Sequence, residues 1–204
     1  DVCSSDLGGY SWTKISDALP KGLWVSHITA SQHKEGRVYV TLNGYRNDHF
    51  LPYLYVSEDF GATWKALGKD LPFEPLNVVR EDPRFDSILY AGSDGGIYVS
   101  FDAGNTFMAW NNGLPASVPV HDIAIQQREN ELVLGTHGRS LYIASLGIVQ
   151  KIFSDPKEKA RAIAEADKRR SLQGTADLNG LFDRQGLEVS ATSLPAEGTK
   201  KKKK

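Results

Sequence analysis

Carboxylates in two polar loops are the residues of this sequence best suited to acid–base chemistry. Asp48 lies in the segment NGYRNDHFL and Asp94 in the segment SDGG, and both segments separate runs typical of β-strands. Hydrolysis of a glycosidic bond needs two carboxyl groups about 5 to 10 Å apart. Asp48 and Asp94 are therefore the candidate catalytic acids, with Glu74 as a third. The alternatives are a solvated loop residue for Asp48 and an ordinary hairpin turn residue for Asp94.

Other side chains in these loops and in the segment THGR are suited to binding a polar ligand. The candidate ligand-binding residues are Tyr45, Arg46, His49, His137 and Arg139. The alternative for His137 and Arg139 is that they form hydrogen bonds with neighbouring loop carbonyls. His121, at the start of a strand, is a further polar residue that could lie near this site, and its alternative is a hydrogen-bonded histidine of the core. The five histidines show no metal-binding spacing. The glycines of SDGGIYVS lead into a strand rather than a helix, so no phosphate site follows. We therefore predict no metal and no cofactor.

A recurring turn indicates how these loops are positioned. The segment SEDFGATW contains Ser57, Asp59, Gly61 and Trp64, and SFDAGNTF repeats the spacing with Ser100, Asp102, Gly104 and Phe107. A third, incomplete copy is GGYSW, where Leu7 stands at the aspartate position. The aspartates are predicted to accept hydrogen bonds from the turn's own amides, and the glycines to supply positive φ. We interpret these carboxylates as structural, because each serves a separate unit.

Short strand patterns follow one another at intervals of roughly 40 to 50 residues. The first group is LWVSHITA, RVYVTLNG, PYLYVS and TWKAL; the second is LNVVRED, ILYAGS, GIYVS and TFMAW; the third is VHDIAIQ, LVLGTH and SLYIA. Four antiparallel strands in a unit of this size are typical of a β-propeller blade. The third group lacks a fourth strand, which we expect another part of the ring to supply. In such blades the loops with the candidate residues lie on the face opposite the recurring turn.

The recurring turn resembles the Asp-box (BNR repeat), S-x-D-x-G-x-[ST]-[WF], of sialidases, sortilin-type receptors and xyloglucanase-type glycosyl hydrolases. The segments YVTLNGYRND, NVVREDP, LPASVPVHDIAI and LVLGTHGRSLYI resemble the C-terminal end of sortilin-like bacterial glycosyl hydrolase propellers, over residues 8 to about 146. This resemblance implies an all-β fold. It is a partial β-propeller of four-stranded antiparallel blades with Asp-box hairpins, followed by a C-terminal helix and a disordered basic tail.

The resemblance implies a glycosyl hydrolase acting on polysaccharide, but it leaves the enzymatic role of this chain open. In xyloglucanase-type relatives the catalytic acids come from different propeller domains, so at least one would lie outside this chain. The alternative is a non-catalytic propeller that binds protein, peptide or glycan, and a third is an assembly factor. A sialidase would need three arginines, and only Arg46 and Arg139 lie on suitable loops. The implied location is extracytoplasmic, and the implied partners are the ligand and the remaining blades of the same chain.

Composition excludes several classes of protein. The 204 residues include 24 Lys and Arg against 25 Asp and Glu, so nothing indicates nucleic-acid binding. No apolar run reaches the roughly 18 residues that span a bilayer. Cys3 is the only cysteine, which excludes a disulfide framework and a thiolate metal site.

The two ends of the chain differ from the repeated region. Residues 1–7, DVCSSDL, resemble a translated sequencing adapter and are set aside from fold prediction. The resemblance implies that the true N-terminus is missing, and this would explain why no export signal is visible. Residues 147–204 are predicted to be a linker, a helix over about 156–172 and a flexible Lys-rich tail. The helix begins with the capping pattern Asp155-Pro156-Lys157-Glu158. The tail is interpreted as solvated rather than as a polyanion-binding segment.

Overall fold

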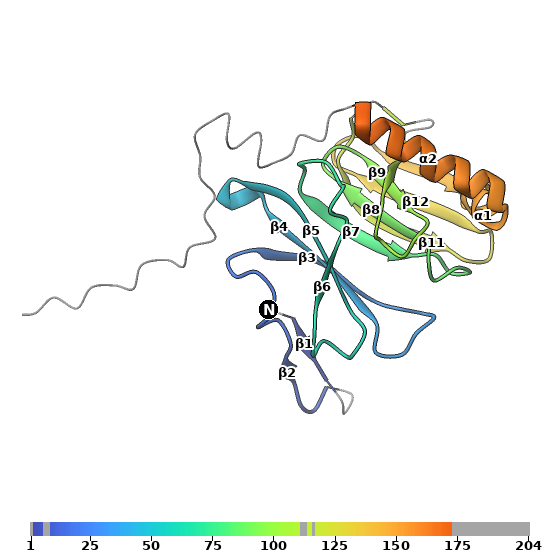
Figure 1. Cartoon of the computed structure of the whole chain (residues 1–204). Helices are drawn as coiled ribbons and strands as arrows, with labels where there is room; N and C mark the ends of the chain where they lie inside the picture. The colour runs from blue at the N-terminus through green and yellow to red at the C-terminus, as the bar shows by residue number, and fades with distance from the viewer. Residues whose placement is uncertain (1, 6–8, 111–113, 116, 173–204) are drawn as a thin grey trace, which may run out of the picture. The chain divides into compact units, whose positions relative to one another are not determined.

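The computed structural model describes residues 2–5, 9–110, 114–115 and 117–172, which form a series of antiparallel sheets (Figure 1). A two-stranded N-terminal hairpin comes first, made of β1 (Cys3–Ser4) and β2 (Thr13–Lys14). Three larger sheets follow and are called blades 1, 2 and 3. The chain divides into two compact units, residues 1–166 and 167–204, and all the sheets belong to the first.

Each blade is a meander of consecutive strands. Blade 1 contains β3 (Trp24–Ala30), β4 (Val38–Gly44), β5 (His49–Ser57) and β6 (Lys65–Leu67). Blade 2 contains β7 (Leu76–Glu81), β8 (Leu89–Ser93), β9 (Ile97–Ser100) and β10 (Met108–Ala109). Blade 3 contains β11 (Val120–Gln126), β12 (Glu131–Thr136) and β13 (Leu141–Ser145). The predicted all-β class with four-stranded antiparallel sheets is confirmed, and the third sheet has three strands as the sequence indicates.

Apolar side chains from neighbouring blades pack against one another and form the core. Successive side chains of a strand point to opposite faces of the sheet, so each blade presents apolar residues to both neighbours. The cluster between blades 1 and 2 includes Tyr39, Leu54, Val56, Leu76, Val79, Leu89 and Phe107. The cluster between blades 2 and 3 includes Val78, Tyr90, Ile97, Val99, Ile123, Leu132 and Leu134. The blades therefore stabilise one another through their faces.

The first strand of every blade carries a bulge at the same position. The pairing register shifts at Ser26 in β3, at Asn77 in β7 and at His121 in β11. A bulge turns its residue out of the regular alternation and re-aims the side chain. The Ser26 hydroxyl donates to the Leu76 carbonyl at 3.0 Å, and the Asn77 amide donates to the Val120 carbonyl at 3.2 Å. The bulges thus link the first strands of successive blades.

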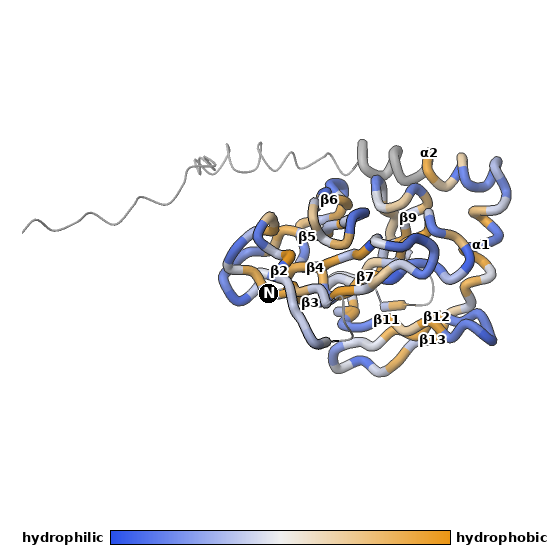
Figure 2. Tube along the Cα trace, turned by 90° about the horizontal axis from the view of Figure 1, so that it is seen from below, coloured by the Kyte–Doolittle hydropathy of each residue, from blue (hydrophilic) through white to orange (hydrophobic). Residues whose placement is uncertain are grey.

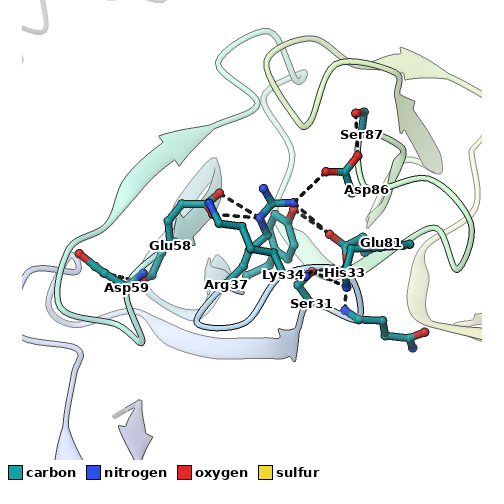
Figure 3. A network of polar contacts seen from close by, with 12 residues as sticks. Ser31, His33, Lys34, Arg37, Glu58, Asp59, Glu81, Asp86 and Ser87 are labelled. Carbon is teal, nitrogen blue, oxygen red and sulfur yellow. Dashed lines mark hydrogen bonds and ion pairs between the residues drawn. The ribbon is translucent and has the colours of Figure 1, made fainter.

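Glu81, at the end of β7, connects blade 2 to blade 1 (Figure 3). Its carboxylate accepts hydrogen bonds from the Ser31 hydroxyl at 2.7 Å and from the Tyr39 hydroxyl at 3.2 Å. Arg37 donates to the same carboxylate at 3.4 Å and to Glu58 at 3.0 Å. Burial and the nearby Glu81 charge raise the pKa of Tyr39 well above its usual range. The Tyr39 hydroxyl therefore acts as a donor at all ordinary pH values.

The next residue, Asp82, connects blade 2 to the segment after blade 3. Asp82 is fully buried, and its carboxylate accepts hydrogen bonds from the Tyr90 hydroxyl at 2.7 Å and the Gln150 amide at 3.0 Å. The backbone amides of Arg84 and Phe85 donate to the same carboxylate at 2.8 and 3.1 Å. These donors compensate for the loss of hydration on burial.

Two helices follow the last strand, and the first of them lies in the segment predicted as a linker. Helix α1 (Gly147–Ser154) buries Val149, and Phe153 packs 4.9 Å from the ring of Phe85. The apolar residues of GIVQKIF recur at helical spacing, but the segment is short and its helical form depends on packing against blades 2 and 3. Helix α2 spans Pro156–Leu172, the range predicted from the capping pattern, and Asp155 accepts from the Lys157 amide at 2.8 Å. The predicted Lys-rich tail lies outside the described residues.

The N-terminal segment also differs from expectation, because part of it belongs to the fold. Val2 is 3% exposed and packs with Leu19, Val40 and Leu42 beside blade 1. Cys3 and Ser4 pair with β2. An apolar side chain such as that of Val2 is buried when it lies against a sheet face, whether or not the segment is native. The adapter origin of residues 1–7 therefore stays a prediction.

Replacing Asp82 by alanine is expected to lower the free energy of unfolding by about 3 kcal/mol or more, because several buried donors lose their acceptor. Chemical denaturation followed by circular dichroism measures this. The matched control is Asp86→Ala, whose exposed carboxylate lies 3.7 Å from Arg37 and is expected to contribute less than about 1 kcal/mol. Equal losses in the two variants would contradict the structural role of Asp82.

Candidate functional site

The loop between β4 and β5 is built around a short 3-10 helix, η1 (Tyr45–Asn47). The guanidinium of Arg46 lies 4.1 Å from the centroid of the Trp24 ring, within the range of a cation–π contact. The Asn47 amide donates to the Gly22 carbonyl at 2.7 Å. Asp48 ends the helix with a left-handed conformation, φ 57°, and its side chain is exposed. These contacts fix the loop against the start of blade 1.

Exposed aromatic residues gather around this loop. Trp24, Tyr45, Phe50 and Phe73 are 56, 56, 38 and 45% exposed, and we call them the aromatic surface. Phe50 and Phe73 lie 6.2 Å apart between ring centroids, and Arg46 lies over Trp24. Of these four residues, the sequence prediction included only Tyr45. Trp24 and Phe73 lie where one blade leads into the next, so only the folded chain brings them to the loop.

His49 is partly held by its own strand. Its ring lies 6.1 Å from that of Tyr53 in a stacked arrangement, and the Tyr53 hydroxyl lies 3.1 Å from His49 Nδ1. The side chain of His49 is nevertheless exposed. Among the predicted ligand-binding residues, Tyr45 and Arg46 therefore lie on η1, His49 begins β5 two residues after it, and all three side chains are exposed.

Two of the three candidate acids are engaged in hydrogen bonds within the protein. Asp94 accepts from the Asn77 amide at 2.9 Å. Glu74 accepts from the Ser93 hydroxyl at 2.7 Å and from the Tyr98 hydroxyl at 3.3 Å. Burial and the Glu74 charge raise the pKa of Tyr98 above its usual range, so this hydroxyl stays protonated. Asp48 remains exposed on η1, and the described residues include no contact between Asp48 and Asp94.

Asn77 joins the loops of the three blades. Its side-chain oxygen accepts from the Asn43 amide at 2.9 Å, and its nitrogen donates to Asp94 and to the Val120 carbonyl. Asn43 lies in blade 1 and Val120 in blade 3. Sequence reasoning missed Asn77, because a bulged position cannot be recognised from a strand pattern alone. Asp94 thus takes part in a hydrogen-bonded bridge between the blades.

On blade 3, the structure brings His121 and His137 together. Their ring centroids lie 5.1 Å apart, and both side chains are exposed. The His137 amide donates to the Pro119 carbonyl at 3.0 Å, which fixes the loop, and Arg139 is exposed nearby in sequence. Within the described ranges, no group of three or more His, Cys, Asp or Glu residues is arranged to hold a metal ion.

A second polar cluster lies on the first strands of the blades and was not predicted. Arg80 of β7 donates from Nε to the Ile123 carbonyl at 2.7 Å, and its Nη2 lies 3.7 Å from the Asp122 carboxylate. Burial and the Arg80 charge lower the pKa of His27 on β3. His27 is therefore neutral at pH 7. The cluster ties the three strands together and leaves Arg80 partly exposed.

The recurring turns have the same hydrogen bonds in blades 1 and 2. Asp59 accepts from the Thr63 amide at 2.8 Å and from the Thr63 hydroxyl at 2.6 Å, and Asp102 accepts from both groups of Thr106 at 2.8 Å. The amides of Gly61 and Gly104 donate to the serine hydroxyls at 2.8 Å, and both glycines have positive φ. In the incomplete third copy, the Gly9 amide donates to the Ser5 hydroxyl at 2.8 Å.

These hydrogen bonds support the structural interpretation of the turn residues. The bonds from Thr63 and Ser57 lower the pKa of Asp59 from 3.8 to about 2. A carboxylate stabilised in its charged form is a poor general acid at neutral pH. Trp64 donates from Nε1 to the Ile15 carbonyl at 2.8 Å, and the Phe107 amide donates to Asp70 at 2.8 Å. Each turn thus also contacts the preceding sheet.

Comparison with solved structures identifies the architecture. The GH74 xyloglucanase from Xanthomonas campestris aligns with a TM-score of 0.50 at 17% identity, over 65% of this chain and 22% of that chain. Together with the row of four-stranded sheets, this decides the fold. The chain has the fold of a partial β-propeller. No protein-family model and no curated protein sequence matches it.

Two further structures align less well. The GH74 enzyme of Niastella koreensis aligns with a TM-score of 0.45 at 17% identity, over 57% of this chain and 18% of that chain. A structure described as YCF48 bound to D1 peptide has a TM-score of 0.28 at 12% identity, over 68% and 70% of the two chains. Both scores are too low to support an argument. This propeller chain spans less than a quarter of the length of either GH74 structure.

Replacing Asp59 by asparagine is expected to destabilise the protein in a pH-dependent way. Because folding lowers the pKa of Asp59 from 3.8 to about 2, its charge stabilises the native state above pH 4 and ceases to do so as the pH falls towards 2. The difference in unfolding free energy between the two proteins should therefore shrink over this interval, as measured by urea denaturation at several pH values. The control is Asp17→Asn in an exposed ion pair with Lys14 at 3.1 Å. A difference that is constant from pH 7 to 2 would contradict the explanation.

Proposed function

We propose that this chain supplies a glycan-binding face of a sortilin-like Asp-box propeller protein that acts on polysaccharide. The observation that carries the proposal is the aromatic surface, with exposed Trp24, Tyr45, Phe50 and Phe73 beside the polar loop of η1. Clustered exposed aromatic residues with polar neighbours are typical of recognition sites. Likeness to the xyloglucanase fold is compatible with this and does not by itself establish it.

The chemistry of the surface suits a sugar chain. Aromatic rings carry a negative face, which attracts the slightly positive C–H groups on the flat side of a pyranose ring. Arg46 holds Trp24 from one side at 4.1 Å and presents guanidinium donors that suit sugar hydroxyls. The exposed side chains of Asp48 and His49 add an acceptor and a second polar group. An exposed surface of aromatic and polar side chains suits an extended polysaccharide better than a small charged ligand.

Bond cleavage is assigned in this proposal to a longer protein rather than to this chain alone. Asp94 and Glu74 already accept hydrogen bonds from Asn77, Ser93 and Tyr98, which leaves Asp48 as the exposed member of the three candidate acids. A glycosidase needs a second carboxyl group at a defined separation. We therefore propose that the complete protein is an extracytoplasmic glycosyl hydrolase that combines this face with further blades. None of the described helices has the length and apolar character needed to cross a membrane.

Replacing Trp24 by alanine is expected to weaken polysaccharide binding by up to about tenfold, because one aromatic contact contributes roughly 0.5–1.5 kcal/mol. Affinity electrophoresis in gels that contain xyloglucan, a mixed-linkage glucan or no polymer measures the change. Tyr45→Ala should act in the same direction. The matched control is Trp12→Ala, which removes a 67% exposed tryptophan from the N-terminal hairpin and should leave the mobility unchanged. Equal retardation of all three variants would overturn the assignment of this surface.

The 204-residue chain alone is expected to release no reducing ends from the same polymers. A reducing-sugar assay over long incubation measures this, with the chain and its Asp48→Asn and Asp94→Asn variants in parallel. Product formed by the chain and lost in one of these variants would show that this chain carries a catalytic acid. That result would replace the binding role by hydrolysis.

A further inference from the structure

Two histidine side chains meet on blade 3, where β11 begins and β12 ends. His121 occupies the bulge of β11, and His137 directly follows the last residue of β12. Figures 1 and 2 show β11 and β12 side by side. The ring centroids lie 5.1 Å apart, and the ring planes are tilted by 34°. We call His121 and His137 the histidine pair. It joins residues of neighbouring strands, so no spacing along the sequence reveals it.

Hydrogen bonds of the backbone hold both members of the histidine pair in place. Val120 pairs with Thr136, and these two residues directly precede the two histidines. The His137 amide donates to the Pro119 carbonyl at 3.0 Å, and the Thr136 hydroxyl donates to the Ser140 carbonyl at 2.5 Å. Side chains that start from a hydrogen-bonded sheet are positioned more precisely than those of a free loop. The short distance between the rings therefore follows from the fold of blade 3.

The ring nitrogens of the histidine pair are available to an external ligand. Two other histidines are engaged within the protein: His33 Nε2 lies 2.8 Å from the Asp82 carbonyl oxygen, and His49 Nδ1 lies 3.1 Å from the Tyr53 hydroxyl. In contrast, no described residue forms a hydrogen bond with a ring nitrogen of the pair. Both side chains are also exposed, so packing does not prevent the rings from rotating towards a shared ligand.

The distance between the two rings suits a single metal ion. A zinc–nitrogen bond of about 2.0–2.1 Å places the ion about 3.2 Å from the centroid of each ligating imidazole ring. Two such distances enclose an angle of roughly 105° at the ion when the centroids lie 5.1 Å apart. This angle is close to that of the tetrahedral coordination typical of zinc. Imidazole nitrogen suits zinc, copper and nickel, whereas calcium and magnesium prefer oxygen ligands.

The protein supplies two ligands at this place and leaves the rest of the coordination open. The neighbouring carboxylate, that of Asp122, lies 3.7 Å from Arg80 and accepts from the Ile123 amide at 2.8 Å. This agrees with the lack of any group of three or more metal-ligating side chains among the described residues. Closed structural zinc sites have four protein ligands. A site with two ligands would instead bind an exchangeable ion that the fold does not require.

We propose that the histidine pair binds one divalent transition-metal ion of the class Zn²⁺, Cu²⁺ or Ni²⁺, through one ring nitrogen of each residue. Water or a donor group of another molecule completes the coordination. Among these ions Cu²⁺ binds most tightly, as the usual order of affinity for nitrogen ligands requires. The proposal uses no residue of the aromatic surface, and it does not depend on glycan binding.

The test is calorimetric titration of the 204-residue chain with zinc chloride, without a polyhistidine tag. All proteins carry Cys3→Ser, because the exposed Cys3 thiol is itself a metal ligand. One zinc ion per chain is expected. His121→Ala and His137→Ala should each lower the affinity at least about tenfold, because two linked ligands bind one ion much more tightly than either alone. Electron paramagnetic resonance with Cu²⁺ should show two nitrogen ligands in the parent protein and one in either variant.

Two controls separate the histidine pair from its surroundings. His49→Ala removes an exposed histidine from another loop and should leave the affinity unchanged. Arg139→Ala removes an exposed positive charge beside His137 and should not weaken binding. Circular dichroism confirms that the variants fold. A parent protein that binds no zinc would overturn the proposal. An affinity that falls equally in His49→Ala would also overturn it, because binding would then be spread over surface histidines.

Discussion

Each of the three blades has two apolar faces, and this constraint governs the rest of the structure. A strand that is buried on both sides cannot follow a simple polar and apolar alternation, and β8 is buried along its whole length from Leu89 to Ser93. Among the described sheets, blade 2 packs against blade 1 on one face and blade 3 on the other, and its strands supply much of both core clusters. Blades 1 and 3 each bury one of their own faces against blade 2. The N-terminal segment with Val2 and Leu19 partly covers the other face of blade 1, and the other face of blade 3 leaves Leu141 and Ile143 exposed.

Polar bridges determine the register in which the sheets face each other. Apolar packing is non-directional, so it holds two sheets together without specifying their alignment. Glu81 and Asp82 are consecutive, and their carboxylates bind in opposite directions, to Ser31 and Tyr39 before blade 2 and to Gln150 after blade 3. The bulge residues Ser26 and Asn77 also form hydrogen bonds to the next blade, near the other end of the first strands. A buried acceptor that lost its donors through a shift of the sheets would be costly, and this makes the register specific.

The same hydrogen bonds explain which polar side chains stay engaged within the protein. The turns that contain Asp59 and Asp102 satisfy their own backbone and contact the preceding sheet, so their side chains are committed to structure. On the loop face, Asn77 and Asp94 bridge the blades in the same way. The groups left exposed there include the aromatic residues near η1 and the side chains of Arg46, Asp48 and His49. The sequence of this loop can therefore vary while the bridges keep the sheets aligned.

The sequence by itself determined the strands, their grouping and the turn chemistry. Each of these depends on local rules: strand composition, glycine at positive φ in Gly61 and Gly104, and a carboxylate two residues after a serine. It also indicated that Tyr45, Arg46 and His49 share a loop. Only the tertiary structure decided that Asp94 is a bridge, that Trp24 and Phe73 join the loop, and that residues 147–154 form a helix. Those outcomes depend on contacts between segments distant in the chain, and a residue's type does not reveal which neighbour the fold will place against it.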